Sequence, residues 1–403
     1  MARIAVVGAG VIGVTSAYLL ARAGHEVTLI DASNEAGRGA SAGNAAQLSW
    51  AYGDAMASPA LLRHLPAVLA GRDPAFRIRW QFDADFLRWG LRFLANSSQR
   101  RWWSNTCAIL KIADQSRREL AMLLAEVDLS FDYRIAGKLH LYSDRVSFAA
   151  AGPGVERKKA FGLTQRLLGR GEAEEIEPAL ASYQSEIAGA VFTPDDALGD
   201  AAAFCRQLTS HMVDRYGVEA CFGQRVVGFA QRGGRLDAIR FDDRENLAVE
   251  MAVVAAGPLI RTLAADLPEA RSVRPVRGYS LTMPWIGGAP RVSLTDVKRK
   301  LAFAAIGEQF RVAGLADMER PGSGFDADRL EALRASACTV LPQLFDRGTE
   351  MKLWSGERPM TPSSQPIICP SRHIRGVYVN VGHGMLGWTL ALGSARRLVG
   401  IMQ

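Results

Sequence analysis

The stretch that decides the fold is Arg3-Ile4-Ala5-Val6-Val7-Gly8-Ala9-Gly10-Val11-Ile12-Gly13, after which a helical run leads to a second strand that ends at Asp31. A GxGxxG motif is specific when it joins a strand to a helix and an acid ends the next strand, and both conditions hold here. Gly8 permits the tight turn, Gly10 lets a pyrophosphate approach the backbone, and Gly13 lets the helix pack on the sheet. Phosphates are attracted by the helix N-terminus, and Asp31 suits ribose hydroxyls. The stretch therefore predicts a Rossmann-type unit that binds a dinucleotide.

Composition limits the class of protein. The chain has 403 residues, of which 48% are hydrophobic, so a large core and two domains are expected. The formal net charge of +7 is spread along the chain and suits an anionic substrate, a membrane surface or a solvated face. No nucleic-acid-binding motif is present. Five cysteines, far apart and without CxxC or zinc spacing, indicate reduced thiols and no metal site.

Cellular location is inferred from targeting signals and hydropathy. The first strand begins at residue 3, which leaves no room for a cleaved leader. Residues 377–394 lack formal charge but contain four glycines, so a strand, a turn and a helix are expected there rather than a membrane span. We expect a cytoplasmic protein. The mixture of arginine and tryptophan over residues 77–103 leaves two alternatives, an aromatic core with a charged outer face or a peripheral contact with the inner face of the cell membrane.

The order of elements favours one cofactor. Helices are expected over residues 60–127 and 326–340, and three strands with short turns form a β-meander over 225–231, 235–241 and 247–254. A nicotinamide-binding unit usually continues with further βαβ units. Here the chain instead returns at residues 377–389 with a second strand, glycine turn and helix, whose positive end would stabilise charge on a reduced isoalloxazine. This architecture favours FAD over NAD.

Several further motifs, taken together, give a specific resemblance to a known family. They are Gly8-x-Gly10-x-x-Gly13, Ser41-x-x-Asn44-x-x-Gln47, Gly137-x-Leu139, Gly199-Asp200, Ala256-Gly257-Pro258, Gly278-Tyr279-Ser280, Gly356-x-Arg358-Pro359-Met360-Thr361-Pro362 and Gly382-His383-Gly384-x-x-Gly387-Trp388-Thr389. Over nearly its whole length the chain resembles the FAD-dependent amino-acid dehydrogenase and oxidase family, which includes D-amino-acid dehydrogenase, D-amino-acid oxidase and glycine oxidase.

The resemblance implies an α/β fold with two discontinuous domains. A Rossmann-type FAD-binding domain with a β-meander is expected from residues 1–75, 150–185, 200–270 and 345–403. A substrate domain, built on a mixed, mostly antiparallel sheet with helices, is expected from residues 76–149, 186–199 and 271–344.

The resemblance also implies how FAD is held. The first glycine motif and Asp31 would contact the pyrophosphate and the adenosine ribose, residues 41–48 would lie along the pyrophosphate and the flavin, Val226 would meet the adenine through its backbone, and residues 384–389 would border the flavin pyrimidine. Asp31 stands where glutamate is commoner, and Cys369 where glycine is usual. The cysteine motif of covalent flavoproteins is not seen, so non-covalent FAD is expected. The expected contacts are Gly8, Gly10, Val11, Ile12, Gly13, Asp31, Ala32, Ser33, Arg38, Ser41, Asn44, Ala46, Gln47, Leu48, Val226, Ala256, Gly257, Gly356, Gly384, Met385, Leu386, Gly387, Trp388 and Thr389.

Three residues are candidates for a direct part in the reaction. Arg358 matches the arginine that holds the substrate carboxylate in such oxidases, and the alternative is an ion pair with Glu357 or another acid. Tyr279 belongs either to the pocket or to the core. His383 is a candidate base, although the glycine turn makes its backbone position an alternative requirement.

The implied activity is the oxidation of the C–N bond of a small amino acid, most closely a D-amino acid, to an imino acid and then a 2-oxo acid. The α-hydrogen would leave as hydride to flavin N5, and electrons would pass to a quinone or another acceptor, as in amino-acid catabolism. One alternative is a cyclic or N-methyl amino acid such as hydroxyproline, sarcosine or glycine. Another is a flavoprotein subunit of a larger electron-transfer complex.

Overall fold

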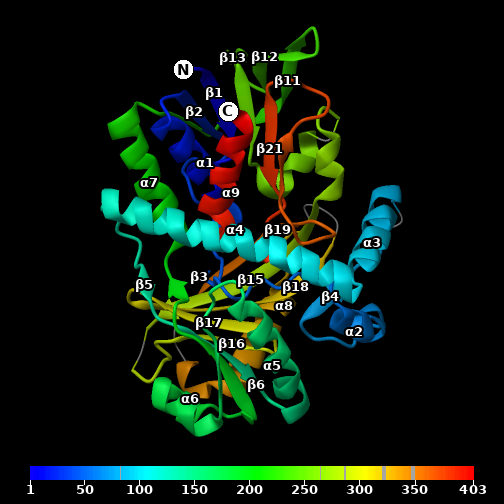
Figure 1. The fold of residues 1–403 in the computed structure, drawn as a ribbon, viewed down its shortest axis with the longest axis vertical. Coiled ribbons are helices and arrows are strands. Elements are labelled where there is room, and N and C mark those ends of the chain that lie inside the picture. Colours follow the sequence, from blue (N-terminus) through cyan, green and yellow to red (C-terminus); the bar gives the residue numbers. More distant parts are fainter. Residues whose placement is uncertain (82, 264, 286, 320–323, 346–349) are drawn as a thin grey trace.

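The two halves of the molecule lie at opposite ends, as Figure 1 shows, with the long helix α4 (Gln99–Glu126) between them. The computed structural model describes residues 1–81, 83–263, 265–285, 287–319, 324–345 and 350–403. A six-stranded sheet forms the core of one half and a nine-stranded sheet that of the other. The nucleotide unit and the expected substrate unit are therefore built on separate sheets.

The six-stranded sheet is built from both ends and the middle of the chain. Its central strands are parallel, and the order is β10-β2-β1-β14-β21-β20, with β20 antiparallel at the edge. This arrangement confirms the Rossmann-type unit and its completion by the C-terminal strand. The strands are β1 (Arg3–Val7), β2 (Glu26–Asp31), β10 (Glu219–Phe222), β14 (Met251–Val254), β20 (Ile367–Pro370) and β21 (Val377–Val381).

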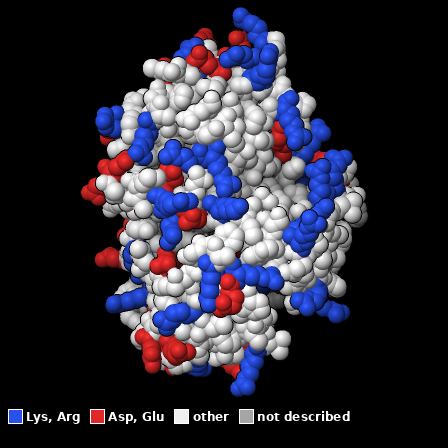
Figure 2. All heavy atoms as spheres, in the orientation of Figure 1, with Lys and Arg blue, Asp and Glu red and all other residues white. Residues whose placement is uncertain are grey.

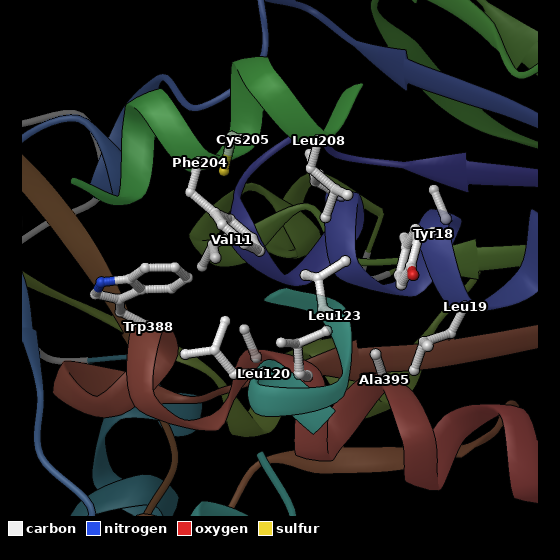
Figure 3. Packing of buried hydrophobic residues seen from close by; sticks show 14 of the residues in the cluster. Val11, Tyr18, Leu19, Leu120, Leu123, Phe204, Cys205, Leu208, Trp388 and Ala395 are labelled. Atoms are coloured by element: carbon white, nitrogen blue, oxygen red, sulfur yellow. The ribbon is translucent and has the colours of Figure 1, made fainter. Parts of the chain in front are cut away.

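Helices cover one face of this sheet. They are α1 (Val11–Arg22), α7 (Ala201–Tyr216), α9 (Gly387–Met402) and α4, and Figure 3 shows side chains from all four in one apolar cluster. Phe204 and Trp388 have ring centroids 4.7 Å apart within it. Asp200 caps α7 by accepting from two backbone N–H groups, and Gly217 ends α7 in a left-handed conformation.

The β-meander covers the opposite face. It consists of β11 (Val226–Arg232), β12 (Arg235–Phe241) and the short β13 (Leu247–Ala248). Phe229 and Ile239 of the meander pack with Val254 and Val379 of the six-stranded sheet. The meander is confirmed, with one difference: the third expected run divides, because β13 pairs with β12 whereas β14 joins the parallel sheet beside β1.

The nine-stranded sheet is mixed and mostly antiparallel. Its order is β19-β15-β18-β17-β16-β6-β8-β7, and β4 pairs with β18 beside this path. Helices α8 (Ala327–Val340) and α6 (Arg170–Ile176) pack on it. The strands are β4 (Phe76–Ile78), β6 (Lys138–Tyr142), β7 (Arg166–Leu168), β8 (Gly189–Thr193), β15 (Arg274–Pro284), β16 (Ser293–Asp296), β17 (Leu301–Ile306), β18 (Gln309–Met318) and β19 (Lys352–Met360).

Smaller elements connect the two halves. A three-stranded sheet, β3-β9-β5, lies where the segment after the first glycine motif meets the larger sheet. The five cysteines are all free, as expected. The remaining elements are β3 (Gln47–Leu48), β5 (Arg134–Ile135), β9 (Ala197–Leu198), α2 (Pro59–Leu69), α3 (Ala84–Asn96), α5 (Arg145–Lys159), η1 (Gly39–Ser41), η2 (Pro178–Ser182), η3 (Gly257–Leu263), η4 (Pro268–Ser272), η5 (Pro342–Leu344) and η6 (Gly384–Leu386).

At least four elements lie in a different half from the one expected, and one of them is α6, whose Ala173 joins the core of the nine-stranded sheet. Helix α4 packs on α1 and α9, because its buried leucines belong to the core of the nucleotide unit. Strand β7 pairs with β8, and Leu168 joins the core of the nine-stranded sheet. Strand β19 pairs with β15 from Arg274↔Met360 to Thr282↔Lys352, so it extends that sheet rather than the nucleotide unit.

Charge and hydropathy add two observations. Figure 2 shows lysine and arginine distributed from one end of the visible face to the other, interspersed with acidic residues. In the part of the chain that the structure describes, none of the helices combines the length and the apolar character needed to cross a membrane.

Candidate active site

The first glycine turn is fixed by close backbone contacts. Gly8 has a φ of +108°, and a Cβ there would lie 2.5 Å from the Ala255 carbonyl oxygen. A Cβ on Gly13 would lie 1.6 Å from the Gly8 carbonyl oxygen. Gly10 differs, because its Cβ would come no closer to a neighbour than 3.5 Å, at Ser41 Oγ. Gly8 and Gly13 are therefore required for packing, whereas Gly10 leaves a shallow space at the start of α1, which fits the approach of a pyrophosphate.

Asp31 organises the same turn. Its carboxylate accepts hydrogen bonds from the Ala9 N–H at 2.6 Å and from the Ser33 N–H at 2.7 Å. A carboxylate has about four lone-pair directions, so both oxygens retain capacity to accept from ribose hydroxyls. Asp31 thus has a structural duty that the motif alone did not indicate, and the ribose contact stays a prediction.

The segment over residues 41–50 joins three parts of the site. Ser41 Oγ accepts from the Val11 N–H at 3.1 Å, at the start of α1. Gln47 Nε2 donates to the Leu294 carbonyl at 3.2 Å, on the nine-stranded sheet. The Ser49 N–H donates to Thr389 Oγ1 at 3.0 Å, at the start of α9. The segment therefore runs from the first glycine turn, over the larger sheet, to the second glycine turn.

Two residues within that segment fix its bend. Ala46 has a φ of +56°, and its N–H donates to Asn44 Oδ1 at 2.8 Å. The Asn44 carbonyl accepts from Arg311 Nη1 of β18 at 3.0 Å. Leu48 lies in the apolar core of the nucleotide unit, so its side chain serves packing.

The second glycine turn interlocks with β19. Gly382 and Gly384 have φ values of +86° and +56°, and a Cβ on Gly384 would lie 2.4 Å from Met360 Sδ. Met360, the last residue of β19, also forms an isolated β-bridge with His383. Met385 lies in the turn and is 52% exposed, and helix α9 begins directly after the turn. The turn therefore meets the strand that carries Arg358, as the resemblance implies.

The side chains of His383 and Trp388 point away from the turn. His383 is buried, its Nε2 lies 3.0 Å from Ser394 Oγ of α9, and burial lowers its pKa to about 3. The Trp388 indole lies in the apolar core (Figure 3) and donates to the Gly199 carbonyl at 3.0 Å. A neutral, buried imidazole that packs against Ser394 of α9 is poorly placed as a general base, because a general base must reach the proton that it removes. The geometry favours the alternative that the backbone of this turn is what the site requires.

Arg358 lies on β19 and reaches across β15. A Cβ on Gly278 would lie 2.1 Å from Arg358 Cζ, so the glycine makes the space that the guanidinium occupies. Arg358 Nη1 donates to the Leu315 carbonyl at 3.0 Å. Burial lowers its pKa to about 10, an effect that the negative charge of Asp317 partly offsets.

No acid pairs with Arg358 within the described ranges of the chain. Its neighbour Glu357 instead binds Arg277, whose Nη2 lies 2.9 Å from Glu357 Oε1. The alternative of an Arg358–Glu357 ion pair is therefore not supported. A half-buried guanidinium without a paired carboxylate is suited to bind one bidentately.

Tyr279 belongs to the core. Its side chain is fully buried on the opposite side of β15 from Gly278, and its hydroxyl donates to Asp317 Oδ2 at 2.9 Å. Asp317 also accepts from Arg329, at 2.6 Å and 2.9 Å. Burial and the adjacent carboxylate raise the pKa of Tyr279. Of the two alternatives for this residue, the geometry favours packing.

Sequence reasoning missed a buried polar group around Lys138. Lys138 Nζ donates to Ser49 Oγ at 2.8 Å and lies 4.7 Å from the centre of the Tyr52 ring. Burial lowers the pKa of Lys138 to about 8, while burial raises that of nearby Asp196 to about 7. The signal was present in residues 138–142, where every second residue is polar and yet the strand lies inside the protein.

The other predicted cofactor contacts lie around the nucleotide unit. Ala32 is exposed after β2, and the Ser33 carbonyl accepts from the Gly223 N–H at 2.9 Å. Arg38 forms an exposed ion pair with Glu35 at 2.6 Å. The remaining positions are Ile12 in α1, Val226 at the start of β11, Ala256 and Gly257 after β14, Gly356 beside the Trp354 ring, and Leu386 and Gly387 at the start of α9.

Comparison with known proteins identifies the family. The profile of the family described as "FAD dependent oxidoreductase" matches residues 3–400. The chain belongs to this family. It is 36% identical to D-amino acid dehydrogenase 2 of Ralstonia nicotianae, covering 99% of this chain and 96% of the relative. It is 37% identical to D-amino acid dehydrogenase of Dechloromonas aromatica, covering 98% and 96%.

Solved structures confirm the fold. Glycine oxidase from Bacillus cereus superposes with a TM-score of 0.74 at 16% identity, covering 100% of this chain and 95% of that one. L-Proline dehydrogenase from P.horikoshii superposes with a TM-score of 0.73 at 18% identity, covering 100% and 93%. The predicted family, the α/β fold class and FAD as the cofactor are therefore confirmed, and the protein is an FAD-dependent oxidoreductase.

Proposed function

We propose that this protein oxidises the C–N bond of a D-amino acid, giving an imino acid that water converts to a 2-oxo acid, and passes the electrons to a quinone or another acceptor. The observation that carries the proposal is Arg358, a guanidinium without an acidic partner in the described structure, held beside the second glycine turn. The names of the similar relatives, D-amino acid dehydrogenases, support the choice of substrate.

Arg358 orients the substrate. Two parallel charge-assisted hydrogen bonds to the α-carboxylate fix both the position and the rotation of the amino acid. Gly278 provides the room, and the Leu315 carbonyl holds one guanidinium nitrogen in place. When bound, FAD supplies the acceptor for the α-hydrogen as hydride. Positioning therefore accounts for most of what the protein contributes, and the substrate amine reacts as its free base.

The cofactor is proposed to be held without a covalent bond. The first glycine turn and Asp31 would hold the pyrophosphate and the ribose. The backbone of residues 384–386 and the segment over residues 41–48 would border the isoalloxazine. Gly10 leaves the shallow space that a phosphate group needs. Denatured protein should release FAD into the supernatant, whereas a flavin that stays with the chain would contradict this part of the proposal.

The decisive experiment is anaerobic bleaching of the bound flavin by a panel of amines. D-Alanine, D-methionine and D-glutamine should bleach it, while L-enantiomers, sarcosine, L-proline and an amino-acid amide should bleach it far more slowly. Reoxidation is then followed with a quinone analogue and with oxygen separately. If sarcosine or proline bleaches the flavin faster, the substrate is a cyclic or N-methyl amine rather than a D-amino acid. Faster reoxidation by oxygen would make the protein an oxidase.

A peripheral membrane contact is the second proposal, and it is supported by helix α3. Leu87, Leu91 and Leu94 of this helix are 52%, 69% and 42% exposed. One face of the helix therefore exposes several apolar side chains to water, which is typical of an interaction surface. Arg88 and Arg92 flank them and would meet anionic headgroups. By contrast, Trp89 is buried, so only part of the tryptophan and arginine mixture faces outward.

Vesicle flotation tests this contact. Holoenzyme should float with vesicles that contain phosphatidylglycerol and less with neutral phosphatidylcholine vesicles. Leu91→Glu should reduce flotation without changing dye-coupled activity, and Val146→Glu, at another exposed apolar residue that is 81% accessible, is the matched control. Equal flotation of both variants and the native protein would contradict the contact.

A further inference from the structure

One face of the nine-stranded sheet is polar although it is buried. Alternate residues on neighbouring strands point to the same side, and this side is the one on which Arg358 lies over Gly278. We call it the polar face. Its members are Gly278, Ser280 and Thr282 of β15, Arg311 and Ala313 of β18, Ala302 and Ala304 of β17, Ser293 and Thr295 of β16, and Lys138 and His140 of β6.

Within the part of the chain that the structure describes, four polar atoms on this face have no hydrogen-bond partner. They are Ser280 Oγ, Ser293 Oγ, Thr295 Oγ1 and His140 Nε2, all on side chains that are 9% exposed or less. More than about 90% of buried polar groups in proteins are hydrogen-bonded, so such a group of exceptions needs an explanation. Three of the four lie together, because Thr295 pairs with His140 across β16 and β6 and Ser293 is two residues away. A ligand or water that binds here would satisfy them.

Small side chains separate this group from Arg358. Arg358 donates to Leu315 of β18, and Ala313 of β18 and Ala302 of β17 lie between that point and Thr295. Adjacent strands are about 4.8 Å apart, so β18 and β16 are on the order of 10 Å apart. A side chain that leaves a carboxylate bound to Arg358 can therefore cross the two alanines and end near Thr295.

Tyr52 closes this region from the nucleotide unit. Its ring centroid lies 4.4 Å from that of His140, and the side chain is 40% exposed. Burial nevertheless raises the pKa of Tyr52 to about 12. The Tyr52 ring therefore packs against the His140 ring.

The two lysines nearest His140 each have a carboxylate nearby. Lys138 lies close to Asp196, and Lys158 forms an ion pair with Asp54. Burial and these two lysines hold the pKa of His140 well below its usual range, so the imidazole is neutral. An additional charged group would enter without a partner and lose its hydration. Beside the uncharged His140, Ser293 and Thr295, a neutral hydrogen-bonding group is therefore favoured over an ammonium or a carboxylate.

We propose that His140, Ser293 and Thr295 form a subsite that binds the uncharged, hydrogen-bonding end of a long substrate side chain, such as the amide of glutamine. This inference rests on the proposed function, because Arg358 must first bind the carboxylate. Glutamine provides an amide that both donates and accepts, which matches two hydroxyls and a neutral imidazole. Methionine has a similar length and lacks such a group.

The test compares D-glutamine with D-methionine. Dye-coupled kcat/KM should be higher for D-glutamine in the native holoenzyme, and higher than for D-glutamate and D-lysine. Thr295→Val keeps the shape of the side chain and removes its hydroxyl. It should lower kcat/KM for D-glutamine and leave kcat/KM for D-methionine unchanged, so that the ratio of the two values falls by about three- to tenfold. Ser293→Ala is the second variant, should Thr295→Val fold poorly.

Thr209→Val is the matched control. Thr209 is also a buried threonine whose hydroxyl has no partner, but it lies on α7 in the nucleotide unit. Its replacement should leave the ratio unchanged. The subsite is wrong if D-methionine is preferred by the native protein, or if the Thr295 and Thr209 variants give the same ratio. Failure to oxidise any D-amino acid, with FAD bound, would overturn the proposed function and the subsite together.

Discussion

The two large sheets are both buried on both faces, yet only one of them is apolar on both. In the six-stranded sheet, Val6 and Leu29 face the helices while Ala5 and Ile30 face the meander, and all four belong to apolar clusters. In the nine-stranded sheet, one side carries Tyr279 and its apolar neighbours under α8, and the other is the polar face. The difference separates a sheet that serves as a scaffold from one whose second face carries chemistry.

This contrast predicts how substitutions should behave. Changes in the nucleotide unit should affect folding and FAD retention together, because its packing forms the cofactor turn. On the nine-stranded sheet, substitutions on the polar face should affect catalysis, whereas substitutions on the apolar face should affect stability.

Gly13→Ala should have the largest effect. Its Cβ would lie 1.6 Å from the Gly8 carbonyl oxygen, and backbone on both sides cannot move without displacing β1 or α1. The expected loss is above about 4 kcal/mol in the free energy of unfolding, with no FAD retained. Urea unfolding and the absorbance of purified protein measure it.

Gly90→Ala is the control for this change. An added Cβ at Gly90, inside α3, meets nothing within 4 Å. This variant should be stabilised by about 0.5–1 kcal/mol, the usual benefit of alanine over glycine in a helix. A Gly13→Ala protein that is yellow and as stable as the native chain would show that the first turn is not constrained in this way.

Arg358→Ala should give the next largest effect, and on activity rather than on folding. Loss of one partner of a buried charge pair costs about 2–5 kcal/mol, which is about 30- to 5000-fold in kcat/KM for a D-amino acid. FAD content should stay the same, and Arg358→Lys should recover only part because an ammonium lacks the planar fork. Steady-state kinetics measure the activity, and flavin absorbance measures the FAD content.

Arg334→Ala serves as the matched arginine. Arg334 lies on α8 in an exposed ion pair with Glu331, which contributes little to stability. Its kinetics should equal those of the native protein. If Arg358→Ala instead loses FAD or folds poorly, the guanidinium is structural and the two faces of the sheet are not separable at this point.

Tyr279→Phe should show the reverse pattern. The buried Asp317 would lose one donor but keep Arg329, so the free energy of unfolding should fall by about 1–2 kcal/mol. Because Tyr279 faces the core, kcat and KM should change less than twofold. Urea unfolding and kinetics on the same preparation check both statements, and a large fall in kcat at unchanged stability would return Tyr279 to the pocket.

His383→Gln should have an effect on stability only in acid. The folded-state pKa of His383 is about 3, below the ordinary 6.5, so between these values the unfolded chain binds a proton that the folded chain does not. Its contribution to stability is therefore complete above pH 6.5 and declines as the pH falls. Between pH 6.5 and pH 5 the native protein should lose up to about 2 kcal/mol more than His383→Gln.

The exposed His64 of α2 provides the comparison. Urea unfolding at the two pH values should show that His64→Gln follows the native protein. If His383→Gln loses as much stability in acid as the native chain, the imidazole is not held neutral by burial.

Sequence reasoning predicted those features that depend on local backbone requirements. The two glycine turns and the meander each need particular residues at fixed spacing, so the pattern identified them. The pairing of β19 with β15 was missed, because strand partners depend on contacts between residues far apart in the chain. The position of α4 was missed for the same reason: its apolar residues show a buried face but not which core it joins.

Within the site, the sequence identified positions better than roles. Arg358 was assigned from its motif, whereas the sequence could not show that Glu357 pairs with Arg277 and that no acid among the described residues pairs with Arg358. The motif also contained His383 and Trp388, whose side chains turned out to pack into α9 and the core. Lys138 was not singled out, because a polar residue in a strand ordinarily faces water.

The threading of the chain through the six-stranded sheet has a consequence for biosynthesis. Strand β14 pairs on one side with β1 and on the other with β21, so its neighbours come from opposite ends of the sequence. On the ribosome, β1, β2, β10 and β14 are exposed before β21 and α9 have been made, and the apolar surface that α9 will cover is open in the meantime. High sequence separation of this kind slows folding and favours aggregation. Truncation before residue 377 should therefore give insoluble chains rather than a smaller nucleotide-binding protein.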